Sequence, residues 1–440
     1  MNLEQIIENN RITKNPVLDL SNFHSRHEPM NISLLVNFVH LETLIISNLQ
    51  LENLSPLQNF HQLKKLVLIN NEINDISPLS ELTNIEYLDL SYNKIENIYI
   101  IDNFFKIKEL YLNNCGIQTL HLNSKTFQNL QKLVAHNNNF ESFSLNDLSC
   151  LEIISPIFFN KNLTLVNLPK LKILEFHNLE FSDKEILLQG LENLETLGCY
   201  LYNYKDFEFP QNLHKLKYLS IGLYDDECSF LKNLPNKEVL EALEIVYNNN
   251  LSIKNVNLLQ ECVSLKKLSL SNCKIKDISF LEQMTNLEEL NLSTNEITDI
   301  SVMKNLSKIK ELWLDNNYIT DICAIKDLAY LEHLTLSNNK IQNFSVIKSL
   351  KSLKYINIVG NSPSIPPERW LVHFIYYGRS MQHLPELPFI DEIWQLIVSD
   401  SNFEELARQL ARGQNWSEED ITVYFAFKRG SFFIEDDLPF

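Results

Sequence analysis

The chain has 440 residues, of which 45% are apolar, so it can bury a continuous core and is not of a disordered composition. Its formal net charge of −18 disfavours a partner that presents a phosphate backbone, and we expect no nucleic-acid binding. Only 8 residues are glycine, which argues against glycine-rich nucleotide-binding loops.

The cysteines indicate a reducing environment. The 7 cysteines are spread along the chain without a CxxC pair, which favours free thiols.

The first residues lack the apolar stretch of a signal peptide, and no apolar run is long enough to span a membrane. We therefore expect a soluble, cytoplasmic protein; if the protein is bacterial, delivery into a host cell is an alternative.

The N-terminal 40 residues predict a cap. Residues 2–9 favour a short helix, capped by Asn2 and with Leu3, Ile6 and Ile7 on one face. Residues 17–21 (VLDLS) resemble a degenerate first strand. A repeat array must cover its open end, and residues 1–40 are suited to that role.

From Leu41 the chain repeats with a period close to 22 residues. Each repeat opens with an LxxLxL pattern, as in LKKLVL at 63–68 and LEHLTL at 331–336. The L-x-L alternation has period two, which predicts a short strand with one buried face. The repeats open at Leu41, Leu63, Ile85, Ile107, Leu130, Leu151, Leu171, Leu194, Leu216, Leu240, Leu265, Leu287, Ile309, Leu331 and Leu353.

Three residues after the last leucine of this pattern, most repeats carry an asparagine. A buried Asn at a sharp turn can both donate to and accept from the backbones of adjacent repeats, and losing one should cost about 1–3 kcal/mol. Cys115 and Cys273 take the same place in their repeats. The asparagines are Asn71, Asn93, Asn138, Asn248, Asn295, Asn317, Asn339 and Asn361.

Beyond the asparagine, apolar residues recur every three positions, as at Ile73, Ile76, Leu79 and Leu82. This spacing predicts a back wall of 3₁₀-helical or tight extended structure rather than α-helix. Pro78 fits such a wall, because proline lacks the donor that a sheet would need.

These motifs resemble the leucine-rich repeat family in its 22-residue class, which includes nuclear phosphatase-1 regulators and internalin-type bacterial surface proteins. The resemblance covers residues 41–361. It implies an α/β repeat solenoid, a right-handed horseshoe whose parallel β-sheet lines the concave face and binds a partner protein there.

The pattern weakens between Leu151 and Val239. The leucines persist, but Phe159, Leu179, Tyr202 and Tyr224 replace the asparagines. Two interpretations stay open: sequence drift with altered curvature, or a bent segment shaped for a ligand.

Residues 362–440 form a third region, in which the repeats stop and helix signals replace them. Helices are expected near 366–377, 392–398, 403–411 and 417–427, which predicts a small helical domain. Within it, Leu387-Pro388 followed by Glu392-Ile393 resembles the opening of an F-box, although an ordinary amphipathic helix explains the same residues.

Function is expected from the residues that flank the leucines, because these point outward from the sheet. Trp and Tyr dominate protein-binding surfaces, and here they alternate with acids. The alternative is that aromatic residues simply favour strands. The predicted partner-binding residues are Tyr87, Asp89, Tyr92, Glu109, Tyr111, His136, Tyr200, Tyr218, Tyr247, Glu311, Trp313, Asp315, His333 and Tyr355.

The chain shows no catalytic or metal-binding motif: no Ser/His/Asp spacing, no HExxH and no metal cluster. We therefore expect a non-enzymatic interaction scaffold without cofactor or metal, binding a protein with a basic or mixed surface. Glu311 with Trp313 resembles the acid–aromatic pairs of the phosphatase regulators. The alternatives are a ubiquitin-ligase substrate adaptor that uses the F-box-like segment, and a bacterial effector of the leucine-rich repeat type. The oligomeric state is left open.

Overall fold

The computed structural model describes residues 3–23, 30–95, 98–178, 185–201, 209–210, 212–223, 229–245, 256–358 and 360–361. They belong to two compact units, unit 1 (Met1–Tyr224 with Asn233–Asn236) and unit 2 (Asp225–Lys232 with Lys237–Phe440). The expected helical domain at 362–440, its F-box-like segment, and residues Leu179, Tyr202, Tyr224, Tyr247 and Asn248 lie outside the described ranges.

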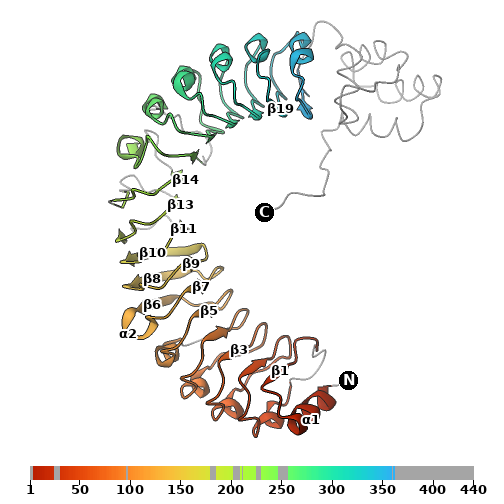
Figure 1. Cartoon of the computed structure of the whole chain (residues 1–440), viewed down its shortest axis with the longest axis vertical. Coiled ribbons are helices and arrows are strands. Elements are labelled where there is room, and N and C mark those ends of the chain that lie inside the picture. Colours follow the sequence, from red (N-terminus) through yellow and green to blue (C-terminus); the bar gives the residue numbers. More distant parts are fainter. Residues whose placement is uncertain are drawn as a thin grey trace, which may run out of the picture. The chain divides into compact units, whose positions relative to one another are not determined.

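Both units are built from short parallel strands that alternate with 3₁₀-helices (Figure 1). Unit 1 contains α1 (Leu3–Thr13), β1 (Val17–Asp19), η1 (Ile32–Leu35), β2 (Thr43–Ile45), η2 (Ser55–Leu57), β3 (Lys65–Val67), η3 (Ser77–Leu79), β4 (Tyr87–Asp89), η4 (Tyr99–Asn103), β5 (Glu109–Tyr111), β6 (Thr119–Asn123), α2 (Ser124–Phe127), β7 (Lys132–Val134), β8 (Phe140–Asn146), β9 (Ile153–Ile154), β10 (Ile157–Val166), β11 (Ile173–Asn178), β12 (Glu185–Gln189), β13 (Thr196–Leu201) and β14 (Tyr218–Leu223). Unit 2 contains β15 (Ala242–Ile245), η6 (Val256–Glu261), β16 (Lys267–Ser269), η7 (Ser279–Gln283), β17 (Glu289–Asn291), η8 (Ser301–Asn305), β18 (Glu311–Trp313), η9 (Cys323–Ile325), β19 (His333–Thr335), η10 (Ser345–Ser349) and β20 (Tyr355–Asn357), and η5 (Ser229–Asn233) lies at the change from one unit to the other.

The sheet of each unit pairs strands of successive repeats in parallel. In unit 1, β1, β2, β3, β4, β5, β7 and β9 follow one another, and in unit 2 the order is β15 to β20. The register is set by the central leucine of each strand: Leu44, Leu66, Leu88 and Leu110 are successive partners, and each has no exposed surface. Their side chains form the core, and the flanking residues of each strand form the opposite face.

The back wall of most repeats is 3₁₀-helical, as the spacing of three predicts. Pro56 and Pro78 sit in the first turn of η2 and η3, where a missing backbone N–H costs little. Asn53 and Asp75 precede these helices, and their side-chain oxygens accept from the backbone N–H of Ser55 and Ser77 at 2.9 and 2.8 Å.

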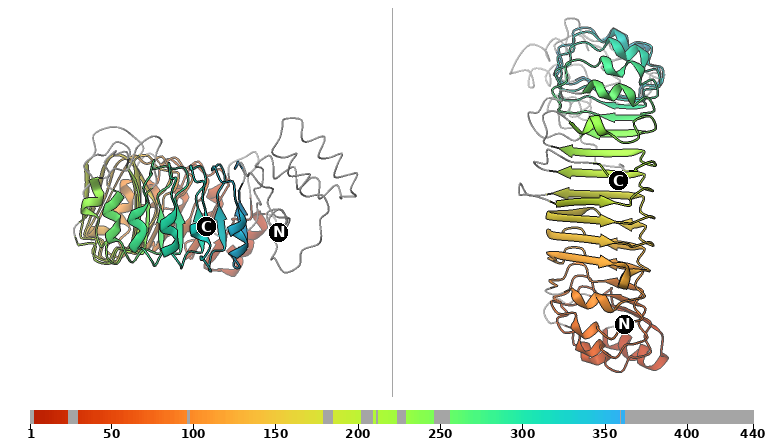
Figure 2. Two further views of the ribbon diagram at one scale, coloured as in Figure 1. Left: turned by 90° about the horizontal axis from the view of Figure 1, so that it is seen from above. Right: turned by 90° about the vertical axis from the view of Figure 1, so that its left-hand side faces the viewer.

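Part of unit 1 has a different back wall. Here β6, β8, the second half of β10 and β12 form a second parallel ladder in place of 3₁₀-helices (Figure 2, right). The sequences explain the change: TLHLN at 119–123 and SFSLN at 142–146 alternate apolar and polar residues with period two. Leu120, Leu122, Phe143 and Leu145 are accordingly buried.

The asparagine at position 9 joins consecutive repeats, counting from the opening leucine or isoleucine as position 1. In unit 2, Asn317 Nδ2 donates to the carbonyls of Leu292 and Leu314 at 3.0 and 3.1 Å, and its Oδ1 accepts from Ile297 N at 3.0 Å. Asn93 makes the same bonds in unit 1 to Leu68, Leu90 and Ile73. This confirms the predicted bridging role of these residues.

In the irregular segment, the strands are longer than in the regular repeats. β11, β13 and β14 have 6 residues each, whereas most strands of the regular repeats have 3. The backbone runs on through positions 7 and 8 in extended form and pairs from strand to strand, as for His177 with Tyr200. The irregular segment thus replaces a side-chain bridge with a wider sheet.

At the N-terminus, α1 extends to Thr13, four residues beyond the predicted end. It covers the end of the core through Asn10, whose Nδ2 donates to the carbonyls of Asn15 and Val17 at 3.0 and 2.9 Å. The expected strand at 17–21 is present as β1, paired with β2. Among the described residues, no helix is both long and apolar enough to cross a lipid bilayer.

The asparagine bridge can be tested in unit 2. We expect Asn317→Ala to lower the free energy of unfolding by about 1–3 kcal/mol, because Ile297 N and two carbonyls lose their buried partner. Urea unfolding followed by circular dichroism measures the loss. As a matched control, Asn286→Ala removes an asparagine whose hydrogen bond to Val263 O is exposed to solvent, and it should cost less. Equal losses in the two variants would contradict the bridging role.

Candidate functional site

The candidate site is the sheet face, formed by the residues at positions 3, 5 and 7 of each repeat. Cross-strand pairing aligns them in rows, so that Lys65, Tyr87, Glu109 and Lys132 follow one another at position 3. The row at position 5 consists of Val67, Asp89, Tyr111 and Val134 in the same order of strands. Strand spacing places neighbours in a row about 4.8 Å apart, within reach of side-chain contact.

Two tyrosines and two lysines form a cluster on the unit 1 face. The rings of Tyr87 and Tyr111 lie 5.1 Å apart between centroids. Lys65 Nζ lies 4.3 Å from the Tyr87 centroid, and Lys132 Nζ lies 5.2 Å from the Tyr111 centroid. An ammonium over an aromatic ring is an attractive contact that leaves the cation accessible to an anion. We call these four residues the tyrosine–lysine cluster.

Two acids belong to the same surface but are already engaged. Glu109 Oε2 accepts from the Tyr111 hydroxyl at 2.8 Å, and burial together with this contact raises the pKa of Tyr111 to about 12. Asp89 is only 6% exposed and accepts from Ser91 N at 2.9 Å. Burial raises the pKa of Asp89 above its ordinary value, against the hydrogen bonds from Ser91 and the charge of Lys65. The outward exposure expected for Asp89 is therefore not what the structure shows, because neighbouring side chains cover it.

Tyr92 lies at position 8, where the backbone of the regular repeats is left-handed. The φ angles there run from 53° to 76°, and 7 of the 10 residues are asparagine and one is glycine. Asparagine and glycine tolerate this region, and a bulky residue in it is an outlier. Tyr92 (φ 61°) and Thr294 (φ 58°) are the exceptions. Tyr92 is 46% exposed, so its ring gains little burial to offset the strain.

A second aromatic group lies on the longer strands of unit 1. The rings of Phe158, His177 and Tyr200 stack with centroid distances of 4.6 and 4.4 Å. His177 Nε2 lies 2.7 Å from Glu175 Oε1, and the Tyr200 hydroxyl lies 2.6 Å from Ser220 Oγ. Tyr218 stands at position 3 of this region, 45% exposed. Phe158 was not among the predicted residues, because the loss of the asparagine hid its alignment.

The unit 2 face is acidic. Its described rows hold four carboxylates and one lysine. The lysine is Lys267, whose Nζ lies 2.7 Å from Glu289 Oε2, and the other carboxylates are those of Glu244, Glu311 and Asp315. Trp313 is half-buried beside Thr335, and the rings of His333 and Tyr355 stack at 6.0 Å. Asp315 is turned to the next repeat: its Oδ1 accepts from Ser337 N at 2.8 Å, and its Oδ2 accepts from the Thr335 hydroxyl.

The predicted residues that the structure describes fall into several groups. Tyr87, Asp89, Glu109 and Tyr111 come together in unit 1, Tyr200 joins the stack of the longer strands, and Glu311, Trp313, Asp315, His333 and Tyr355 belong to unit 2. His136 lies at position 7 of its repeat, and its backbone N–H donates to Asn113 Oδ1 at 3.2 Å.

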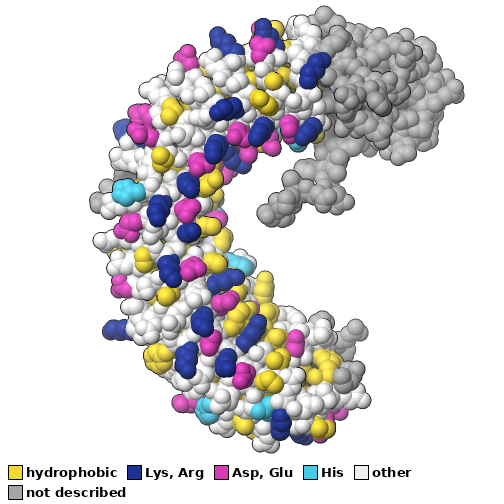
Figure 3. Space-filling model, in the orientation of Figure 1, with side chains coloured by type: hydrophobic (Ala, Val, Ile, Leu, Met, Phe, Trp, Pro, Cys, Tyr) yellow, Lys and Arg dark blue, Asp and Glu magenta, His cyan; other side chains and the backbone are white. Residues whose placement is uncertain are grey.

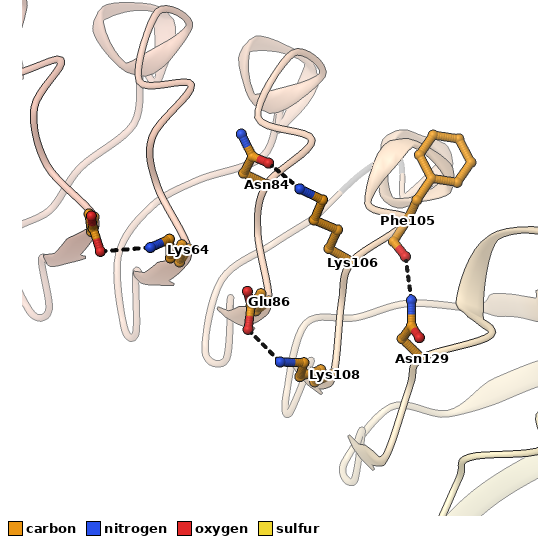
Figure 4. Close-up of polar contacts among 8 residues, drawn as sticks. Lys64, Asn84, Glu86, Phe105, Lys106, Lys108 and Asn129 are labelled. Atoms are coloured by element: carbon orange, nitrogen blue, oxygen red, sulfur yellow. Dashed lines mark hydrogen bonds and ion pairs between the residues drawn. The ribbon is translucent and has the colours of Figure 1, made fainter.

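Position 2 carries a charge pattern that the sequence analysis missed. Along this row Glu and Lys alternate, and neighbouring repeats form ion pairs such as Glu42–Lys64 at 2.9 Å and Glu86–Lys108 at 2.7 Å (Figure 4). Unit 2 repeats the pattern with Glu288–Lys310 and Glu332–Lys354, both at 2.6 Å. Basic and acidic side chains accordingly alternate on the surface of each unit (Figure 3). Solvent screens such exposed pairs, so each adds little to stability, and the row as a whole is nearly neutral.

Burial makes two of the described thiols unreactive. The six cysteines in the described ranges are free, and burial raises the pKa of Cys115 to about 12 and that of Cys262 to about 11. Thiolates are the reactive form, so these two are inert at neutral pH. Among the described residues, no group of three or more His, Cys, Asp or Glu side chains could hold a metal ion.

Comparison with known proteins places this geometry in a class. The family model for leucine-rich repeats (2 copies) matches residues 61–103, 263–305 and 285–329, and no curated protein matches. A leucine-rich repeat protein of Leptospira interrogans is 23% identical over 85% of this chain and 96% of that one, with a TM-score of 0.63. The functional domain of InlJ from Listeria monocytogenes is 20% identical over 73% and 72%, with a TM-score of 0.50. TLR13, solved in complex with ssRNA13, is 22% identical over 85% of this chain and 54% of that one, with a TM-score of 0.51.

The fold is a solenoid of parallel strands and 3₁₀-helices with a repeat of about 22 residues. This is the fold of leucine-rich repeat proteins, and residues 61–103 and 263–329 match the family model.

Backbone strain at position 8 can be tested directly. We expect Tyr92→Asn and Thr294→Asn each to raise the free energy of unfolding by about 1 kcal/mol, because asparagine tolerates the left-handed region better. Urea unfolding gives the change. The reciprocal variant Asn316→Tyr at the same position should lower stability. If neither asparagine variant is more stable than the wild type, these positions are not strained.

The burial of Asp89 predicts a pH dependence. Because its pKa is raised on folding, the folded state holds the proton to higher pH, and ionisation costs stability as pH rises from about 4 through the raised value. Asp89→Asn removes this cost while an oxygen remains to accept from Ser91 N. The stability of the variant relative to wild type should therefore be greater near pH 7 than near pH 4, measured by urea unfolding at both. A difference that does not change with pH would show that Asp89 is not destabilised by burial.

Proposed function

We propose that the protein is a non-enzymatic scaffold that recognises a partner protein through its sheet face. The observation that carries this proposal is the tyrosine–lysine cluster, in which half-buried aromatic and basic side chains gather at positions that the repeat leaves free. Leucine-rich repeat proteins commonly act as protein-interaction scaffolds. Tyr, Trp and Arg carry most of the binding energy at protein interfaces.

The charges support a partner with a basic or mixed surface. The unit 2 rows hold four carboxylates and one ammonium group, which favours basic groups opposite Trp313 and Glu311. TLR13 was solved with single-stranded RNA, but the acidic rows here favour a protein rather than a phosphate backbone. Free cysteines in the described ranges support a reducing compartment such as the cytoplasm.

The test is affinity purification with the tagged full chain from cell lysate, quantified by mass spectrometry. We expect Trp313→Ala and Tyr111→Ala to reduce recovery of partner proteins by about tenfold or more, because aromatic anchors dominate such interfaces. The temperature of thermal unfolding should stay close to that of wild type.

A matched control is available on the back wall. Tyr99 lies in η4 and is 76% exposed, so Tyr99→Ala removes an equally large ring away from the sheet face. It should leave recovery unchanged. If the two sheet-face variants recover the same proteins in the same amounts as wild type, the proposal is wrong for these residues.

A further inference from the structure

We infer that the unit 1 face around Tyr87, Tyr92 and Tyr111 binds an apolar segment of the partner that is bordered by carboxylates. This inference rests on the proposed function and specifies the chemistry of the partner at one part of the sheet face.

The first step concerns the two lysines of the tyrosine–lysine cluster. At position 3, Lys267 is ion-paired with Glu289 at 2.7 Å, and lysines of the position 2 row are paired with glutamates of adjacent repeats. Within the part of the chain that the structure describes, neither Lys65 nor Lys132 has a carboxylate oxygen within 4.0 Å; both rest on tyrosine rings instead. These two cations therefore remain available to anions from outside.

The second step concerns the acids that could have paired with them. Glu109, between the two lysines in the row, is held by the Tyr111 hydroxyl at 2.8 Å. Asp89 is covered and is held by Ser91. The local acids are thus committed to structure, and a partner carboxylate meets no free competitor in the cluster.

The third step concerns the apolar residues around the cluster. In this part of unit 1, position 5 carries Ile45, Val67, Tyr111 and Val134 beside the covered Asp89. In unit 2 the same position carries polar residues beside Trp313, namely Glu244, Ser269, Asn291, Thr335 and Asn357. Ile45 and Val134 are partly exposed, and Ile153 next to Lys132 is 52% exposed. Hydrophobic side chains gather on this part of the surface (Figure 3). Such a strip favours an aliphatic or aromatic side chain of the partner.

The fourth step concerns Tyr92 and the spacing of the cations. Tyr92 keeps an exposed ring on a strained backbone, which is expected when a side chain serves binding rather than folding. Lys65 and Lys132 lie three strand spacings apart, or about 14 Å. The bordering carboxylates of the partner segment should lie at a similar separation.

The experiment is selection of a phage-displayed random 16-residue peptide library on the full chain. We expect the enriched peptides to combine aliphatic or aromatic residues with two Asp or Glu residues. Synthetic copies, measured by fluorescence anisotropy, should bind about tenfold more weakly to Tyr92→Asn and to the double variant Lys65→Gln/Lys132→Gln, and more weakly at high salt.

The control is Lys340→Gln. Lys340 Nζ also lies over a tyrosine ring, 4.6 Å from the Tyr318 centroid, but in unit 2. This variant should bind the peptides as wild type does. Enrichment of basic peptides, equal binding to the double lysine variant, or no peptide that depends on Tyr92 would overturn the inference. If Tyr111→Ala still reduces partner capture while Lys65→Gln/Lys132→Gln does not, the inference fails alone and the proposed function stands.

Discussion

The structure depends on how each repeat satisfies its backbone where the strand turns toward the back wall. In regular repeats one buried asparagine does this, since its amide donates to two carbonyls and its oxygen accepts from the preceding repeat, as Asn93 and Asn317 show. Because each repeat contacts only its neighbours, this bridge is also what links them. A hydrophobic side chain of the same volume would leave those groups unpaired, so leucine burial alone would not specify the turn.

The irregular segment shows the second solution to the same constraint. Phe159 takes the place of the asparagine within the extended β10, and in the next two repeats β11 and β13 pair over 6 residues. The longer strands bring position 7 into the sheet, and this is what aligns His177 and Tyr200 in a stack. The irregular segment thus differs from the regular repeats in its backbone geometry and presents a distinct surface.

The sequence was sufficient for the architecture and insufficient for the site. The period of 22 residues, the L-x-L alternation and the asparagines each have one dominant physical meaning, so strands, core and bridge followed directly. The alternation of Glu and Lys at position 2 could have been read from the sequence, but it requires aligning repeats at a position outside the leucine pattern. The burial of Asp89 could not be read from the sequence, because it depends on side chains of adjacent strands. The strain at Tyr92 could not be read from it either, because it depends on the φ angle.

These last two residues each lower the stability of the fold. Asp89 and Tyr92 belong to one repeat, and each carries a cost that a more common residue would avoid: a desolvated carboxylate in one case, a left-handed tyrosine in the other. In the position 2 row, by contrast, nearly every charged side chain forms an ion pair with one of an adjacent repeat. Charges neutralised within the fold cannot discriminate between partners. On the sheet face, Lys65 and Lys132 in unit 1 and Glu311 in unit 2 have no such ion pair among the described residues. They are the groups through which the proposed partner of mixed charge would be recognised.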